Sequence, residues 1–204
     1  MVPAYKLTYF PVAALAEPTR FLFSYGGIEF EDYRFEEKNW PQIKPNMPFG
    51  QVPILEHNGK VAHQSIAMAR YAAKQVKLVG SNDWEDLEID AIVDTINDLR
   101  QKIGLYGYET DEAIKELRKE PLFKEVLPYY LERLDNIVKA NNGHLALGKL
   151  TWADLYFVAL LKYLNFLCGT DIIADYSHLV ALKKSVLEIP AIKAWVEKRP
   201  KSDV

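Results

Sequence analysis

The chain has little cysteine, no excess of basic residues and no long uninterrupted apolar run. It holds a single cysteine, Cys168, among 204 residues, which excludes an intrachain disulfide framework and indicates a reducing compartment. Lys and Arg number 25 against 28 Asp and Glu, and no basic stripe is present to bind nucleic-acid phosphates. The longest apolar stretch, Leu155 to Cys168, is interrupted by Lys162 and Asn165 and is too short to span a bilayer. With an N-terminus that has no apolar signal core, these features predict a cytoplasmic protein without nucleic-acid or membrane partners.

The first part of the chain alternates between strand and helix signals. The clearest is Asn58-Gly59, the pair most typical of a two-residue hairpin turn, between two short runs of strand formers. Ser65 follows and is placed to cap a helix that runs to about Gln75. In chain order we expect a strand over 6–10, a helix with Pro18 in its first turn, a strand over 29–34, an irregular loop, hairpin strands over 54–57 and 60–63, and the Ser65 helix. This order predicts a small α/β domain over residues 1–78.

Beyond a linker at residues 79–84, the apolar period becomes helical, and we expect an all-helical domain over residues 85–204. One apolar stripe recurs at three- and four-residue spacing over residues 89–103. Thr151-Trp152-Ala153-Asp154 has the pattern of a capping box at a helix start. The helix after it, over residues 155–167, is apolar nearly all round, which predicts that it lies at the centre of a bundle.

Five segments in a fixed order resemble the sigma class of glutathione transferases, with the insect members nearest. They are Lys6-Leu7-Thr8-Tyr9-Phe10, Trp40 with Lys44, residues 47–53 (Met-Pro-Phe-Gly-Gln-Val-Pro), Gln64-Ser65, and residues 150–154. Vertebrate haematopoietic prostaglandin D synthases and cephalopod S-crystallins are related to this class. The resemblance covers about residues 5–200 and implies a thioredoxin-like N-terminal domain, an all-α C-terminal domain, a homodimer, and glutathione as co-substrate.

Tyr9 is the catalytic residue that the resemblance implies, although a tyrosine early in a strand is more often structural. A free thiol with a pKa of about 8.5 is only about 3% thiolate at pH 7. One charge-assisted hydrogen bond contributes about 1.5–3 kcal/mol, which supplies most of a two-unit lowering of that pKa. Phe10 and Pro11 stand where a nucleophilic cysteine would lie, so Cys-dependent transferases and thioredoxins fit poorly. We therefore expect Tyr9 to hold glutathione as a thiolate.

The same resemblance implies a set of glutathione-binding residues. Besides Tyr9, they are Trp40, Lys44, Gly50, Gln51, Val52, Pro53, Gln64, Ser65 and, from the partner subunit, Asp98. It also implies a cis bond before Pro53 that presents the Val52 backbone to glutathione. Without the resemblance, Pro53 reads as an ordinary edge-strand proline and Ser65 as a plain helix cap.

Asp98 follows Asp90 and Asp94 at four-residue spacing, a pattern that usually marks a solvated helix face. By resemblance, Asp98 reaches across a dimer to the glutathione amino group. A vertebrate relative binds a divalent metal near this position, but Asn97 replaces a carboxylate of that cluster, and the four histidines show no ligand spacing. No metal is therefore predicted.

The electrophile pocket is predicted from positions that line it in relatives: Phe10, Val12, Leu15, Arg100, Leu105, Tyr156 and Leu160. Leu15 stands where the vertebrate prostaglandin D synthases carry Arg, which argues against prostaglandin isomerisation. An apolar wall suits small hydrophobic electrophiles such as lipid-peroxidation alkenals and aryl halides. Two alternatives stay open: a catalytically weak structural or ligand-carrying relative of the S-crystallin kind, and a glutathione-dependent prostaglandin isomerase.

Overall fold

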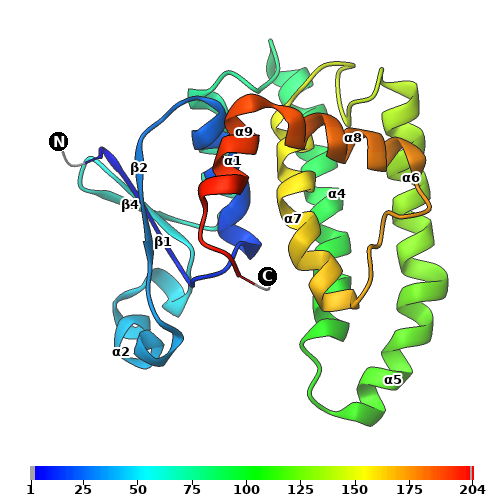
Figure 1. Cartoon of the computed structure of the whole chain (residues 1–204), viewed down its shortest axis with the longest axis horizontal. Coiled ribbons are helices and arrows are strands. Elements are labelled where there is room, and N and C mark those ends of the chain that lie inside the picture. Colours follow the sequence, from blue (N-terminus) through cyan, green and yellow to red (C-terminus); the bar gives the residue numbers. More distant parts are fainter. Residues whose placement is uncertain (1–2, 203) are drawn as a thin grey trace.

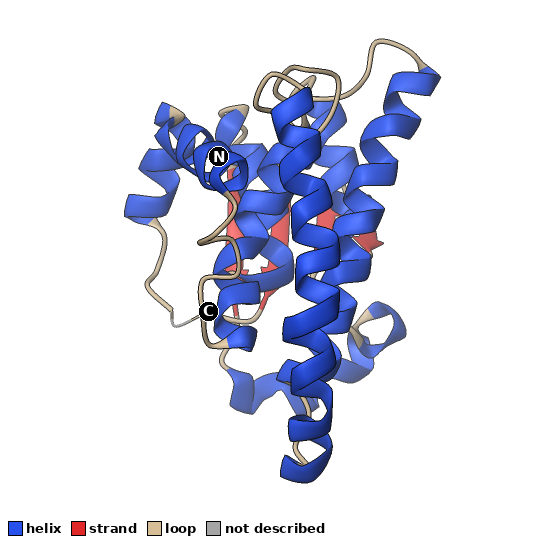
Figure 2. Ribbon diagram, turned by 90° about the vertical axis from the view of Figure 1, so that its right-hand side faces the viewer, coloured by secondary structure: helices blue, strands red, loops and turns tan. Residues whose placement is uncertain are grey.

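A computed structural model describes residues 3–202 and 204 of the chain. It has a β-sheet on one side and a group of long helices on the other, with α1 and α9 between them (Figure 1). Turned by 90°, the molecule shows the helices in front of the strands (Figure 2). Within the described residues, no helix combines the length and the apolar character needed to cross a membrane.

The sheet and its helices come from the first part of the chain. Their bounds are β1 (Tyr5–Tyr9), α1 (Glu17–Tyr25), β2 (Phe30–Arg34), α2 (Trp40–Ile43), β3 (Ile54–His57), β4 (Lys60–His63) and α3 (Ser65–Gln75), with short 3₁₀ turns at Ala14–Ala16, Glu37–Asn39, Lys44–Asn46 and Pro48–Gly50. The strand order is β2-β1-β3-β4. Strands β1 and β2 run parallel, whereas β3 is antiparallel to both β1 and β4. The predicted α/β arrangement is confirmed.

The hairpin between β3 and β4 forms where the sequence predicts it. Asn58 and Gly59 have φ of 49° and 75°, and two successive residues with positive φ are the signature of a type I′ turn. The helix that follows also ends at Gln75 as expected, but Ser65 is not its cap. Gln64 holds the cap position with φ 72° and ψ 105°, and its side chain makes no capping hydrogen bond. The chain turns so sharply out of β4 that Gln64 is the last non-helical residue and Ser65 is already helical.

The second part of the described chain is helical. It comprises α4 (Asp83–Gly107), α5 (Glu112–Pro121), a π-helical turn (Leu122–Val126), α6 (Leu127–Ala140), α7 (Trp152–Cys168), α8 (Ser177–Glu188) and α9 (Pro190–Lys198). Helix α3 ends at Gln75 and α4 begins at Asp83, so the predicted linker at 79–84 falls largely between them. The domain boundary itself stays a prediction.

Helix α7 is buried among other helices, as its apolar sequence predicts. It packs against α1, α4 and α8, and most of its side chains are buried. The predicted capping box opens it: the buried Asp154 carboxylate accepts the backbone N–H of Thr151 and of Leu145, both at 2.8 Å. Because α1 packs on α7, the loop that joins β1 to α1 is held between the sheet and the helical part.

Candidate functional site

A hollow of about 570 Å³ lies where the first part of the chain meets helix α4. Its lining comes from five separate segments: Phe10, Leu15, Trp40, Gly50, Gln51, Val52, Gln64, Ser65, Ile66, Asn97, Arg100 and Gln101. A smaller hollow of about 70 Å³ shares several of these residues and adds Pro48, Pro53 and His63. Most of the predicted glutathione-binding residues are therefore brought together around one depression.

One wall of the hollow is extended backbone. The peptide bond between Val52 and Pro53 is cis, as the resemblance implies, and Gln51 has extended dihedral angles. The ladder between β1 and β3 begins at the Thr8–Ile54 pair, so Val52 precedes it. Extended backbone beside a sheet is the geometry that accepts an added peptide strand through main-chain hydrogen bonds.

A second wall is the N-terminus of α3. Gln64 has φ 72°, a left-handed conformation that is uncommon for a residue with a side chain and that clusters at functional sites. It turns the chain so that Ser65 and Ile66, in the first turn of α3, line the hollow. The first N–H groups of a helix have no partner within the helix, and the positive end of the helix dipole adds to them. This end of the hollow can therefore bind a carboxylate.

The third wall is aromatic and basic. The Trp40 ring centroid lies 5.3 Å from that of Phe10 and 5.7 Å from that of Phe35, so this cluster fixes the indole at the rim. Lys44 is exposed and does not line the hollow, but its side chain lies over Gly50. A Cβ atom at Gly50 would come within 3.3 Å of Lys44 Cε, and the φ of Gly50 is +62°. Both features favour glycine here. The absence of a Cβ atom leaves room for the Lys44 side chain beside the hollow.

Tyr9 is the last residue of β1 and is 7% exposed. Burial raises the pKa of its hydroxyl to about 12, although a hydrogen bond from the Leu15 backbone N–H and the charges of Arg20 and Arg100 act in the opposite direction. Tyr9 does not itself line the hollow, but Leu15, which bonds its hydroxyl, and Arg100 do. A phenol with such a pKa is protonated at neutral pH, so it acts as a hydrogen-bond donor and not as a base.

The predicted electrophile-pocket residues are not all at this hollow. Phe10, Leu15 and Arg100 line it, and Arg100 Nε donates to Asn97 Oδ1 at 2.8 Å. The other four lie elsewhere: Tyr156 and Leu160 are buried in α7, Leu105 is 63% exposed on α4, and Val12 is half-buried in the loop after β1. Their role in binding an electrophile stays a prediction.

Several residues at the site were not predicted as members of it. Asn97 and Gln101 line the hollow beside Arg100, and their spacing of three and four on α4 is the signal that could have identified them. Tyr108 is another. Its hydroxyl lies 3.0 Å from that of Tyr163, and it is close enough to Tyr9 to raise the pKa of that residue. No local sequence signal marks this pair, because it joins α4 to α7 across 55 residues.

The predicted dimer residue lies apart from the hollow of its own chain. Asp98 is exposed on α4 and is not part of the lining, while Asp90 of the same helix is paired with Arg70 at 2.9 Å. Its proposed reach to a partner subunit stays a prediction. In residues 3–202 and 204, no three His, Cys, Asp or Glu side chains gather as a metal site would require.

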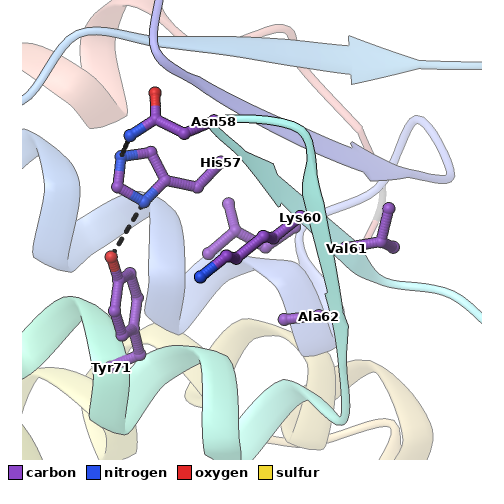
Figure 3. A pocket seen from close by; sticks show the side chains of 7 residues that line it. His57, Asn58, Lys60, Val61, Ala62 and Tyr71 are labelled. Carbon is purple, nitrogen blue, oxygen red and sulfur yellow. Dashed lines mark hydrogen bonds between the residues drawn. The ribbon is translucent and has the colours of Figure 1, made fainter.

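A separate hollow of about 520 Å³ lies on the β3–β4 hairpin and α3. Figure 3 shows His57 and Tyr71 pointing toward one another there, with Nδ1 of His57 2.9 Å from the Tyr71 hydroxyl. The other ring nitrogen lies 3.0 Å from the Asn58 amide, and the ring stacks on Tyr5 with centroids 4.0 Å apart. Both ring nitrogens of His57 therefore have partners within the protein, and none of the predicted site residues lines this hollow.

Comparison with known proteins identifies the family to which the chain belongs. The model of the glutathione S-transferase N-terminal domain matches residues 5–74, and that of the C-terminal domain matches residues 97–199. The chain is 50% identical to a glutathione S-transferase of Anopheles gambiae over 203 residues, covering the whole of both chains. It is 52% identical over 201 residues to glutathione S-transferase S1 of Drosophila melanogaster, covering 98% of this chain and 81% of that one.

A solved structure of a prostaglandin synthase D from Nilaparvata lugens superposes on the chain with a TM-score of 0.94 at 48% identity, covering 98% of this chain and 100% of that one. The two matched domains account for the sheet part and the helical part, and they confirm the predicted fold class. The chain therefore belongs to the glutathione S-transferase family, as an enzyme that takes glutathione as its co-substrate.

Proposed function

We propose that this chain is a sigma-class glutathione transferase in which the Tyr9 hydroxyl donates a hydrogen bond to the glutathione sulfur. The observation that carries the proposal is a buried phenol, protonated at neutral pH, beside the hollow that gathers the predicted glutathione residues. A donor in a water-poor site stabilises the thiolate more than the thiol and so lowers the thiol pKa. The thiolate then attacks the electrophile, and positioning of that second substrate supplies much of the remaining acceleration.

The three walls suggest how glutathione lies. Its peptide backbone pairs with the main chain of Val52, and its γ-glutamyl carboxylate takes the first N–H groups of α3 at Gln64 and Ser65. The glycyl end meets Trp40 and Lys44 at the rim. The amino group of glutathione contacts Asp98 of a partner subunit, so the active enzyme is a homodimer. A cytoplasmic location stays part of this proposal.

For the second substrate we favour small apolar electrophiles such as lipid-peroxidation alkenals and aryl halides. Leu15 and Phe10 supply an apolar surface at the hollow, to which the proposal adds Val12, Leu105, Tyr156 and Leu160. Burial of an alkyl tail contributes about 0.8 kcal/mol per methylene. Longer alkenals should therefore bind more tightly, by about fourfold for each methylene that is fully buried.

A second candidate activity is prostaglandin isomerisation, which the name of the Nilaparvata lugens structure attributes to that protein. A carboxylated endoperoxide needs a counter-charge. Leu15 supplies none, so among the residues that line the hollow Arg100 alone would have to provide it. We therefore rank alkenal conjugation first. An S-crystallin-like structural role ranks last, because the chain keeps Tyr9, Gln51, Gln64 and Ser65 at one site.

One set of assays separates these readings. Purified protein is given an aryl halide, a hydroxyalkenal or a prostaglandin endoperoxide, each with and without glutathione. Glutathione-dependent conjugation that exceeds prostaglandin D formation by a wide margin supports the proposal. Equal or faster turnover of the endoperoxide favours the isomerase, and rates no higher than those without protein favour the structural role.

A further inference from the structure

Arg20 of α1 is a fully buried cation that joins four acceptors from separate parts of the fold. Its Nε donates to Asp32 Oδ1 of β2 at 2.8 Å. Its Nη1 donates to Glu17 Oε2 at 3.1 Å and to the backbone oxygens of Val12 and Ala13 at 2.7 and 3.3 Å. A buried charge is tolerated only when it is paired and hydrogen-bonded in this way. Its guanidinium carbon also lies 6.0 Å from the centroid of the Tyr9 ring.

The two carbonyls that Arg20 holds belong to the loop between β1 and α1, which forms part of the candidate site. Ala14, the next residue, has φ 36°, a conformation that a residue with a side chain keeps only when its surroundings impose it. Leu15 then places its backbone N–H on the Tyr9 hydroxyl and its side chain in the wall of the hollow. Arg20 thus holds the backbone of Val12 and Ala13, just before Leu15, whose N–H orients Tyr9.

The orientation of Arg20 depends in turn on the far end of the chain. Glu17 is completely buried, and its Oε1 accepts from Trp195 Nε1 at 2.8 Å and from Arg199 Nη1. Both donors belong to the α9 region, which packs on α1. Asp32 is shared as well, because its Oδ2 accepts from Arg34 Nε at 2.8 Å. A continuous buried path therefore runs from α9 through Glu17 and Arg20 to the loop beside Tyr9.

We propose that Arg20 is a positioning residue for Tyr9, and that α9 sets its geometry through Glu17. The proposal rests on the proposed function of Tyr9. In it, the planar guanidinium holds Val12 and Ala13 so that the Leu15 N–H and the Tyr9 hydroxyl stay aimed at the glutathione sulfur. A misplacement of about 1 Å near reacting groups can cost about a hundredfold in rate. The packing of α9 on α1 thereby influences the pKa of the glutathione thiol that binds beside Tyr9.

The first test is Arg20→Lys, which keeps the charge but cannot hold carboxylates and carbonyls in the same forked geometry. We expect kcat for aryl halide conjugation to fall about three- to tenfold, while KM for glutathione changes less than about threefold. The pKa of the bound glutathione thiol, followed by ultraviolet titration, should rise by about one unit. The matched control is Arg34→Lys, which alters the other arginine on Asp32. It should leave both quantities close to those of the parent.

A second variant keeps the test open if Arg20→Lys does not fold. Trp195→Phe removes the N–H donor to Glu17 but keeps an aromatic ring against Phe30, whose centroid lies 5.6 Å away. It should raise the thiol pKa in the same direction by a smaller amount. An unchanged titration in the folded variants, with a lowered melting temperature alone, would show that Arg20 is only structural. A parent titration that Tyr9→Phe leaves unchanged would instead overturn the role of Tyr9 itself.

Discussion

The glutathione side and the electrophile side of the candidate site are built in different ways. On the glutathione side, the hollow is formed by the backbone beside Val52, the first turn of α3 and the Trp40 rim, all from the sheet part. On the other side, helix α4 supplies Asn97, Arg100 and Gln101, and the loop after β1 supplies Phe10 and Leu15, whereas the other four predicted pocket residues do not line the hollow. In the proposed binding mode, glutathione is thus recognised by main-chain geometry within the sheet part. The second substrate would depend on side chains from both the sheet part and the helical part.

This difference has a consequence for how substitutions act. Changes at Tyr9, or at Asp98 as it is proposed to reach the partner subunit, should alter the thiolate or the glutathione requirement. Changes at Leu15 or in α7 should alter substrate choice or stability and leave the glutathione surface intact. Four substitutions test this contrast, from the largest expected effect to the smallest.

Tyr9→Phe should have the largest effect on activity. It removes one hydroxyl from a buried position and keeps the ring, so the fold and most of the glutathione affinity should persist. Conjugation of an aryl halide should fall by up to about 25-fold at pH 7, because a rise of about two units in the thiol pKa lowers the thiolate fraction from about 75% to about 3%. Steady-state rates and glutathione binding by calorimetry measure the two quantities. An active variant would place the thiolate-stabilising donor elsewhere.

Asp154→Ala should destabilise the helical part. The carboxylate is fully buried and accepts two backbone N–H groups at the start of α7. Its loss leaves both donors buried and without this acceptor, at a cost of about 2–4 kcal/mol in the free energy of unfolding. Urea unfolding measures the change, and Asp175→Ala at an exposed position is the control. A loss below about 0.5 kcal/mol would show that the capping box is dispensable.

Asp98→Ala should raise KM for glutathione by about five- to tenfold, which corresponds to the loss of one modest ionic contact of about 1 kcal/mol. Thermal stability should hardly change, because the side chain is exposed on α4. Asp94→Ala, one turn earlier on the same helix, is the matched control. Sedimentation belongs to the same experiment, since a fully active monomer would contradict the shared site.

Leu15→Arg should give the smallest change and tests the electrophile side alone. A cation at the hollow offers a carboxylated endoperoxide the counter-charge that Leu15 lacks. We expect the ratio of alkenal conjugation to prostaglandin D formation to fall about threefold to tenfold, equal to about 0.7–1.4 kcal/mol. Leu15→Met, which keeps the size and adds no charge, is the control. A ratio that shifts equally in both variants would mean that charge at this position does not select the substrate.

Much of this organisation could be predicted from sequence, and the reasons are physical. Asn58-Gly59 and the Thr151 capping box are local signals, and both form as expected. Gln64 was not foreseen as the cap of α3, because its left-handed backbone is imposed by the turn out of β4 and not by its own preference. The roles of Glu17 and Arg20 likewise have no local sequence signal, because they depend on contacts with distant segments. Their partners Trp195 and Arg199 lie almost the whole chain away.

The electrophile pocket was the least predictable part for the same reason. Leu15 and Arg100 line the hollow because the β1–α1 loop and α4 meet there, a contact between distant segments. Tyr156 and Leu160 look the same in sequence whether they line a pocket or fill the core of a bundle. The all-round apolar character of α7 favoured the core, and both side chains are buried.

One titration shows whether Tyr9 lowers the pKa of the bound glutathione thiol. The ultraviolet absorbance of thiolate is followed against pH with glutathione saturating the parent protein and the Tyr9→Phe variant. We expect a midpoint near pH ~6–7 in the parent and near ~8–9 in the variant, a difference of about two units. Equal midpoints in two folded, glutathione-bound proteins would contradict this expectation.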